Sequence, residues 1–243
     1  MNYDMNLVLE DGTELPGTGF GAPKTVAGEV VFNTAMAGYV ETLTDPSYRG
    51  QILVCTYPLV GNYGVPAPRL ADSIDLPFES GAVQVQGLVV QNYVADFSHN
   101  AAARSLGAWL KAEGVPGITG IDTRTLTRRL REHGTMRGWL FDSRMALAEA
   151  RSAAASVDMQ DEVFRKVAPD ASHTYGEGEH TILLIDVGAK DNIVRSLLAR
   201  GVRVIRAPYH ADLAPLTDQA DGILIGNGPG DPEDLDDLVK QLR

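Results

Sequence analysis

The residues with the clearest chemical potential form a glycine- and proline-rich loop, GNGPGDP, at residues 226–232. The loop follows the apolar run DGILI, which predicts a strand that ends where the loop begins. Glycine has no Cβ, so a ligand can approach the backbone closely and accept a hydrogen bond from its N–H. Proline has no N–H to offer. The remaining donors are the amides of Asn227, Gly228, Gly230 and Asp231. A rigid loop with few, fixed donors suits an oxyanion or a carboxylate.

Phosphate-binding motifs do not fit this loop. The sequence has no GxxxxGK[ST] motif, and a GxGxxG motif would need glycine at position 231, which is Asp231. From spacing alone, the loop is equally well explained as a plain turn between a strand and a helix, with glycine and proline serving backbone geometry only. Both interpretations stay open on the local sequence.

Nucleophilic and metal-binding chemistry has little support elsewhere in the sequence. Cys55 is the one cysteine, so an intramolecular disulfide and a CxxC metal site are both excluded. It lies in the β-branched run QILVCTYP without a glycine turn beside it, which favours a small buried side chain over a nucleophile. The five histidines are His99, His133, His173, His180 and His210. They share no spacing typical of a metal pair, so we assign none to catalysis and predict no metal site.

The composition limits the class of protein. The 243 residues carry a net charge of −11, which argues against a general nucleic-acid-binding protein, because such proteins neutralise phosphates with lysine and arginine. No apolar run approaches the roughly 20 residues of a membrane-spanning helix. The N-terminus, MNYDMNLVLEDG, lacks the basic region of a signal peptide. We therefore expect a cytoplasmic protein without a nucleic-acid or membrane partner.

The first part of the chain reads as a β-rich α+β domain over residues 1–150. Asp11-Gly12 between two extended runs predicts a hairpin, and short β-branched runs bounded by glycine or proline follow it. Helices are predicted over 100–114 and over 122–134, where Asp122 is the expected N-cap and Gly134 the expected stop. Residues 151–177 contain little to bury and are predicted to be a linker.

The second part, residues 178–243, alternates between strand and helix. Strands are predicted at TILLIDVG, VRVIRAP and DGILIGN, and helices at KDNIVRSLLARG, DLAPLTDQA and PEDLDDLVKQLR. This spacing implies parallel strands joined by right-handed crossovers. The fold class is therefore α/β overall, with a flavodoxin- or Rossmann-like second domain. In such sheets, ligands bind beyond the carboxyl ends of the strands, where DVGAK (186–190) and GNGPGDP lie.

The NGPGDP loop resembles the oxyanion-side loop of class I glutamine amidotransferases. Three longer blocks resemble, in the same order, the small, glutamine-hydrolysing subunit of carbamoyl-phosphate synthase. They are GEVVFNTAMAGYVETLTDPSYRGQILVCTYPLVGNYGV (28–65), GIDTRTLTRRLREHGTMRG (120–138) and IDVGAKDNIVRSLLARG (185–201). The resemblance covers nearly the whole chain and implies that residues 178–243 are the first part of an amidotransferase domain.

The resemblance also implies an activity and a partner. Members of this family hydrolyse L-glutamine to glutamate and ammonia. A large subunit then combines the ammonia with bicarbonate and ATP to make carbamoyl phosphate for arginine and pyrimidine synthesis. No cofactor is expected in the small subunit, since ATP and Mg are used by the large one. The basic helix at 122–133 is either a solvated face or a surface that docks to the large subunit.

Three residues match positions at which the family contacts glutamine. Gly228 and Gly230 correspond to glycines that hold glutamine, and the Gly228 amide would help to form the oxyanion hole. Ser47, in TDPSY, corresponds to a serine that reaches the substrate. Without the resemblance, Ser47 would read only as a turn residue after Pro46.

The catalytic triad of the family is not expected within this sequence. The chemistry needs a cysteine thiolate, a histidine base and an acid that orients it, and the family places all three beyond the position of Arg243. We therefore expect residues 1–243 by themselves to be inactive. The alternative is a non-catalytic fragment that binds the large subunit.

Overall fold

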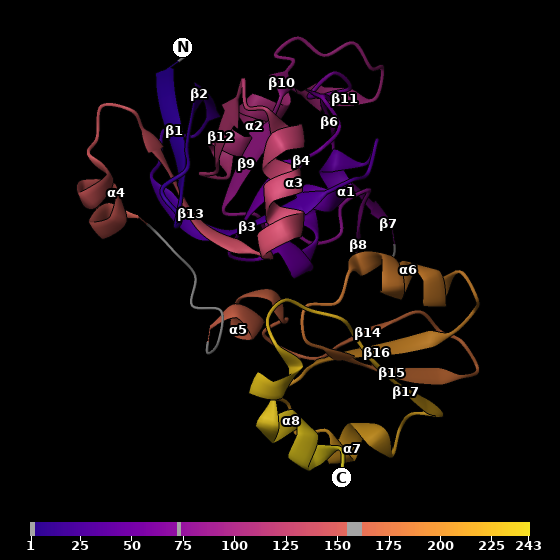
Figure 1. Ribbon diagram of the computed structural model, residues 1–243. Coiled ribbons are helices and arrows are strands. Elements are labelled where there is room, and N and C mark those ends of the chain that lie inside the picture. The colour runs from indigo at the N-terminus through magenta and orange to yellow at the C-terminus, as the bar shows by residue number, and fades with distance from the viewer. Residues whose placement is uncertain (1–2, 72–73, 155–161) are drawn as a thin grey trace. The chain divides into compact units, whose positions relative to one another are not determined.

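The computed structural model describes residues 3–71, 74–154 and 162–243 (Figure 1). Contacts divide the chain into two compact units, which interleave along the sequence. Unit 1 comprises Met1–Thr44, Gly50–Ala67 and Ala82–Val157, and unit 2 comprises Asp45–Arg49, Pro68–Gly81 and Asp158–Arg243. Among the described residues, no helix is long and apolar enough to cross a membrane.

Unit 1 is built on a closed sheet whose strands follow the order β1-β13-β3-β4-β9-β12-β2. These strands are β1 (Tyr3–Leu9), β2 (Glu14–Gly21), β3 (Val26–Asn33), β4 (Gln51–Cys55), β9 (Gly87–Val90), β12 (Pro116–Thr119) and β13 (Met136–Asp142). The predicted hairpin at Asp11-Gly12 is confirmed, since β1 and β2 pair antiparallel on either side of it. Gly12 has φ 87°, a conformation that glycine adopts without steric cost.

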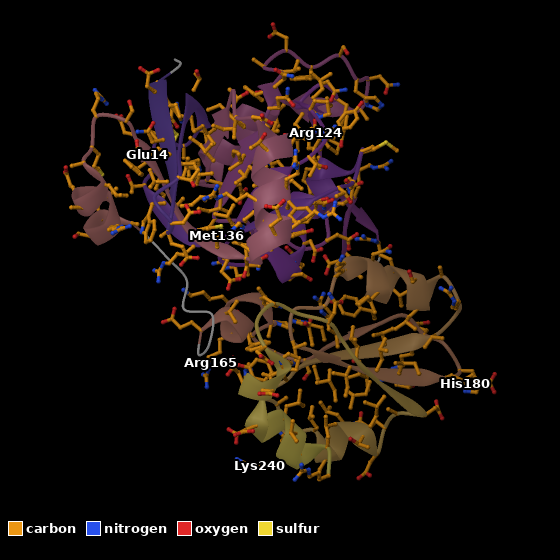
Figure 2. The ribbon with its side chains drawn as sticks, in the orientation of Figure 1. Glu14, Arg124, Met136, Arg165, His180 and Lys240 are labelled. Carbon is orange, nitrogen blue, oxygen red and sulfur yellow. The ribbon has the colours of Figure 1, made fainter. Side chains whose placement is uncertain are left out.

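The core of this sheet is apolar and is covered by α3 (Thr123–His133). Leu126 and Leu130, one turn apart, are buried in the cluster formed by the strands, and each buried leucine contributes about 1.5–3 kcal/mol. The predicted cap is confirmed, because the Asp122 carboxylate accepts a hydrogen bond from the Thr125 N–H at 2.9 Å. Figure 2 labels Arg124 on this helix.

The remaining elements of unit 1 are short. The helices are α1 (Tyr39–Thr44), α2 (Leu106–Ala112) and α4 (Leu147–Ala153), and the strand pairs are β5 (Leu59–Val60) with β10 (Asn92–Tyr93) and β6 (Val65–Pro66) with β11 (Ala102–Arg104). We predicted one helix over 100–114. It begins only at Leu106, because residues 102–104 pair as a strand and the Ser105 hydroxyl caps α2 by accepting from the Ala108 N–H at 3.2 Å.

Unit 2 is a sheet in the order β14-β16-β15-β17. The strands are β14 (His173–Tyr175), β15 (Thr181–Asp186), β16 (Arg203–Pro208) and β17 (Gly222–Ile225). The predicted parallel pairing is confirmed, since β15 is parallel to both β16 and β17. The α-helices of unit 2 are α5 (Val163–Val167), α6 (Asp191–Leu198), α7 (Ala214–Thr217) and α8 (Asp236–Gln241). The short 3-10 helices are η1 (Pro46–Tyr48) and η2 (Pro232–Asp234). A further antiparallel strand pair consists of β7 (Arg69–Ala71) and β8 (Ile74–Leu76).

The segment predicted as a linker, 151–177, carries regular structure where it is described. Residues 151–153 end α4 of unit 1, and α5 and β14 belong to unit 2. Val163 and Phe164 of α5 are buried, and β14 pairs antiparallel with β16. Two short segments from early in the chain also belong to unit 2: Ile74 of β8 packs in the apolar cluster with Leu184 of β15. The last strand, β17, lies at the sheet edge with three exposed apolar side chains, Ile223, Leu224 and Ile225.

Candidate functional site

Two glycine-containing loops meet at the carboxyl ends of β15 and β17. The two strands are paired in register up to Ile185 and Ile225, and the Gly226 N–H then donates to the Ile185 carbonyl at 2.9 Å. A Cβ added to Gly228 would lie 2.0 Å from the Val187 carbonyl oxygen, so this backbone contact admits only glycine. The loop at 226–232 therefore rests directly on the loop that follows β15.

The loop at 226–232 keeps its amides available. In the part of the chain that the structure describes, the N–H groups of Asn227, Gly228 and Gly230 donate to no protein acceptor. Gly230 has φ 72°, the left-handed conformation that favours glycine. The Asp231 carboxylate accepts from the Glu233 N–H at 3.0 Å and so fixes where the loop ends and η2 begins. Free, fixed N–H donors of this kind can stabilise a developing negative charge.

Ser47, predicted from the resemblance, lies beside this loop within unit 2. The Asn227 side-chain amide donates to the Ser47 hydroxyl at 3.0 Å, across 180 positions of sequence. Ser47 itself is held in η1, where its N–H donates to the Asp45 carboxylate at 3.0 Å. The structure thus brings Ser47, Gly228 and Gly230 into one neighbourhood, and their roles toward glutamine stay predictions.

Lys190 is a further residue at this place that sequence reasoning missed. Its ammonium forms an ion pair with the buried carboxylate of Asp45 at 2.7 Å. Partial burial lowers the pKa of Lys190, but the hydrogen bond and charge of Asp45 outweigh it, and the net pKa is raised. The pair ties the loop after β15 to the segment that carries Ser47. The only local signal was a lysine directly after the DVGA turn.

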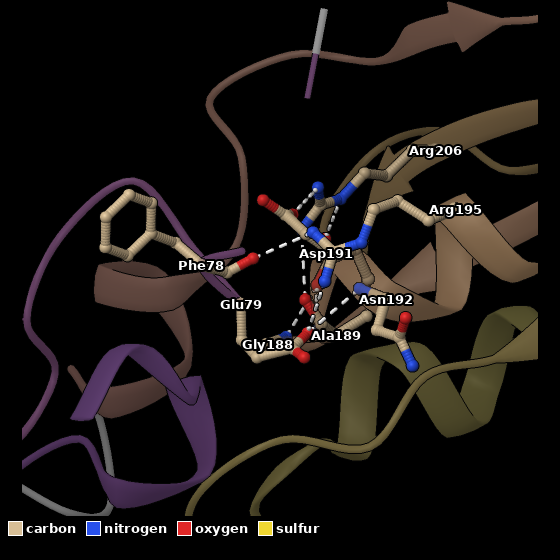
Figure 3. Close-up of polar contacts among 9 residues, drawn as sticks. Phe78, Glu79, Gly188, Ala189, Asp191, Asn192, Arg195 and Arg206 are labelled. Atoms are coloured by element: carbon tan, nitrogen blue, oxygen red, sulfur yellow. Dashed lines mark hydrogen bonds and ion pairs between the residues drawn. The ribbon is translucent and has the colours of Figure 1, made fainter. Parts of the chain in front are cut away.

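A buried ionic cluster holds the loop after β15 in shape. The Asp186 carboxylate, fully buried, accepts from the N–H groups of Gly188 at 2.7 Å and Ala189 at 2.6 Å. Its second oxygen accepts from Arg206 Nε at 2.5 Å. The same guanidinium reaches the Asp191 carboxylate at 2.7 Å and the Ala189 carbonyl at 3.0 Å (Figure 3). One arginine therefore links β16, this loop and the start of α6.

Burial and the neighbouring opposite charges shift the pKa in opposite directions, both at Arg206 and at Asp191. Burial lowers the pKa of Arg206, but the adjacent carboxylates of Asp186 and Asp191 raise it more, so the net pKa lies above its ordinary value. Burial also raises the pKa of Asp191, although Arg206 opposes the shift. We interpret the cluster as a structural ion network, because its charged groups are paired with one another and with the loop backbone.

The segment at 78–79 completes the support of α6. The Glu79 carboxylate accepts from the Asn192 N–H at 2.9 Å and pairs with Arg195 at 3.3 Å. The Glu79 carbonyl accepts from the Asp191 N–H at 2.9 Å, and Arg195 donates to the Phe78 carbonyl at 2.8 Å (Figure 3). An early segment of the chain therefore fixes the first turn of α6, which begins directly after Lys190.

A cavity of about 390 Å³ adjoins the loop at 226–232. It lies within the range of small-molecule sites. Its lining is mostly apolar and consists of Phe164, Val187, Ile225, Gly226, Asn227, Gly228, Pro229, Gly230, Pro232, Leu235, Leu238, Val239 and Leu242. The glycines of the loop thus form one wall of a space that can admit a small metabolite.

Cys55 lies in an environment that disfavours a thiolate nucleophile. It is buried in β4 of unit 1, and burial raises the pKa of its thiol to about 12. The five histidines are exposed. Among the described residues, no group of three histidine, cysteine, aspartate or glutamate side chains is placed to hold a metal ion.

The burial of Cys55 predicts slow thiol chemistry. With a pKa of about 12 instead of 9.0, the folded protein at about pH 8 holds roughly a thousandth as much thiolate, which is the reactive form. Native protein should therefore react with a coloured disulfide reagent about 1000-fold more slowly than protein unfolded in urea. Equal rates in the two states would show that the thiol is accessible.

Two family models match this chain, one in each part of the sequence. Residues 7–140 match the family described as carbamoyl-phosphate synthase small chain, CPSase domain. Residues 183–243 match glutamine amidotransferase class-I. The chain is 40% identical to the carbamoyl phosphate synthase small chain of Pyrococcus furiosus, over 98% of this chain and 65% of that protein.

Two longer relatives are similar over the same extent of this chain. The multifunctional protein URA2 of Saccharomyces cerevisiae is 42% identical over 98% of the chain, which spans 12% of that protein. The mitochondrial carbamoyl-phosphate synthase [ammonia] of Homo sapiens is 40% identical over 98% of the chain, which spans 16% of it. The chain therefore spans less than two thirds of each of these curated relatives.

Proposed function

Because the chain belongs to the carbamoyl-phosphate synthase small-chain family, we propose that it forms part of a glutamine amidotransferase that supplies ammonia for carbamoyl-phosphate synthesis. The observation that carries this proposal is the loop at 226–232. Within the described residues, its amides that donate to no protein acceptor lie beside Ser47. The Ser47 hydroxyl accepts from the distant Asn227 side chain, and the Ser47 N–H donates to the neighbouring Asp45 carboxylate.

The proposed reaction uses the loop as an oxyanion site. A cysteine thiolate attacks the carboxamide carbon of glutamine, and the carbonyl oxygen becomes an oxyanion that accepts from the Gly228 N–H. The C–N bond then breaks, ammonia leaves with a proton from the general acid, and water hydrolyses the thioester to glutamate. Gly230 and Ser47 contact the bound glutamine. Since Cys55 is buried with a raised pKa, we do not assign it as the nucleophile, and we assign the base and the acid to no residue described here.

The proposed partner is a large synthase subunit or domain. It would combine the ammonia with bicarbonate and ATP, with Mg bound there, in the cytoplasm, for arginine and pyrimidine synthesis. No cofactor is assigned to the chain described here. The length of the yeast and human relatives, of which this chain spans 12% and 16%, supports a larger assembly around the small-chain region.

A second candidate function is favoured by the human relative, whose name gives ammonia. In that case the small-chain region would bind the synthase without hydrolysing glutamine. The two candidates differ in one measurable property: an amidotransferase makes carbamoyl phosphate from glutamine or ammonia, whereas the second candidate requires ammonia.

The test is the assembled synthase that contains this chain, assayed with glutamine and separately with ammonium. Wild-type enzyme is expected to use both. Ser47→Ala should raise the KM for glutamine by about 10-fold, because one lost hydrogen bond costs about 1.4 kcal/mol, and should leave the ammonium-dependent rate unchanged.

Ser152→Ala, an exposed serine on α4, is the matched control and should behave as wild type. Synthesis from ammonium but not from glutamine by the wild-type enzyme would refute the amidotransferase and favour the second candidate. An unchanged KM in Ser47→Ala would remove Ser47 from the glutamine site.

A further inference from the structure

The helix α5 lies outside both matched regions, 7–140 and 183–243. Its five residues present two faces. Val163 and Phe164 are buried, whereas Arg165 and Lys166 are exposed. Figure 2 labels Arg165 on this helix. A helix this short does not form by itself, so packing of its buried face must hold it in place.

The buried face of α5 packs against both glycine loops. A Cβ added to Gly230 would lie 3.0 Å from Phe164 Cζ and 3.1 Å from Val163 Cγ1. A Cβ added to Gly188 would lie 2.7 Å from Val167 Cγ2. Figure 1 shows α5 next to the segment that runs from β17 to α8. The absence of a side chain at both glycines is what lets α5 approach.

The Phe164 ring is itself fixed from its other side. It makes an edge contact with Tyr209, with ring centroids 6.0 Å apart. Tyr209 follows β16, and its N–H donates to the Asp186 carbonyl at 3.0 Å. The ring therefore stands between the end of the sheet and the loop at 226–232, and it lines the cavity beside that loop.

The loop has few other restraints on its orientation. Gly226 is bonded to β15, but within the described residues the N–H groups of Asn227, Gly228 and Gly230 make no hydrogen bond to protein. Packing therefore sets the direction of the amides that would meet an oxyanion. The Val187 carbonyl contacts the loop at Gly228, and Phe164 and Val163 contact it at Gly230. Donors stabilise a transition state only when they are held in position before the charge develops.

We propose that α5 is a positioning element of the glutamine site, and that Phe164 holds the Gly228–Gly230 turn with the Gly228 N–H directed at the developing oxyanion. This inference rests on the proposed amidotransferase function. Phe164 contacts no reacting atom. Its effect should therefore fall on kcat with glutamine more than on the KM for glutamine, because a misdirected oxyanion donor weakens binding of the transition state selectively.

The experiment compares Phe164→Ala and Phe164→Leu in the assembled synthase. Phe164→Ala should lower kcat with glutamine by about 10-fold, change the KM for glutamine by less than about 3-fold, and leave the ammonium-dependent rate unchanged. Phe164→Leu keeps most of the apolar contact and should recover most of kcat. Arg165→Ala, on the exposed face of the same helix, should behave as wild type.

A second control separates positioning from stability. Val204→Ala removes packing from the buried cluster of unit 2 that includes Val194, so it should lower the melting temperature without lowering kcat with glutamine. The positioning role is refuted if wild-type enzyme uses glutamine and Phe164→Ala retains its kcat. It is also refuted if Val204→Ala, at a similar loss of melting temperature, loses as much kcat as Phe164→Ala. If wild-type enzyme does not use glutamine, the proposed function fails and the positioning role falls with it.

Discussion

Gly228→Ala is expected to lower the glutamine-dependent kcat of the assembled synthase by about 100-fold or more, with the ammonium-dependent rate unchanged. The added Cβ would lie 2.0 Å from the Val187 carbonyl oxygen and 3.2 Å from its Cγ2. Because the carbonyl belongs to the backbone, it cannot rotate away as a side chain would. The loop must therefore move, and the Gly228 N–H moves with it. A hundredfold loss corresponds to about 2.7 kcal/mol of transition-state stabilisation.

The matched control for this variant is Gly81→Ala. A Cβ at Gly81 would meet nothing within 4 Å, so Gly81→Ala adds the same methyl group as Gly228→Ala but without a clash. It should leave the rates with glutamine and ammonium unchanged. Wild-type kcat with glutamine in Gly228→Ala would show that this amide does not contact the oxyanion, and equal losses with both nitrogen sources would indicate a general disturbance of the enzyme.

Arg206→Met is expected to destabilise unit 2 by about 3–5 kcal/mol, the usual cost of removing one partner from a buried ion pair. The substitution leaves two carboxylates, Asp186 and Asp191, buried without their counter-ion. It also removes the donor to the Ala189 carbonyl. Arg206→Lys keeps the charge but cannot reach all three acceptors with one planar group, so an intermediate loss is expected.

Hydrogen exchange read by mass spectrometry can localise this loss. Peptides from β15 and β16 should exchange faster in Arg206→Met, whereas the fluorescence of Trp109 and Trp139, which both belong to unit 1, should report an unchanged environment. Arg203→Met, on the same strand, is the matched control. Unchanged protection of β15 in Arg206→Met would show that the cluster contributes little to stability.

Local patterns in the sequence predicted the elements that have local causes. The hairpin at Asp11-Gly12 and the cap at Asp122 each depend on a few neighbouring residues, and both are confirmed. The parallel pairing of β15 with β16 and β17 followed from alternation and spacing. The loop at 226–232 was recognised because its glycines and prolines are adjacent in the sequence.

The parts that could not be predicted depend on contacts between distant residues. α5 is too short to show a helical period of apolar residues in the sequence. Its apolar side chains are buried by contact with the two glycine loops, which are distant in sequence from α5. The ion pair of Lys190 with Asp45 and the hydrogen bond of Asn227 with Ser47 join segments far apart in sequence. Resemblance to a family pointed to Ser47, but no local feature distinguishes it from an ordinary turn residue.

The interleaving of the two units has a consequence for how the protein is made. Ser47 leaves the ribosome 180 residues before Asn227, its hydrogen-bond partner, and Asp45 and Glu79 likewise precede Lys190 and Arg195. These early segments cannot complete their contacts during the synthesis of most of the chain. The loop at 226–232 therefore reaches its final form only after translation has passed it, and unit 2 cannot be released intact by any single cut in the backbone.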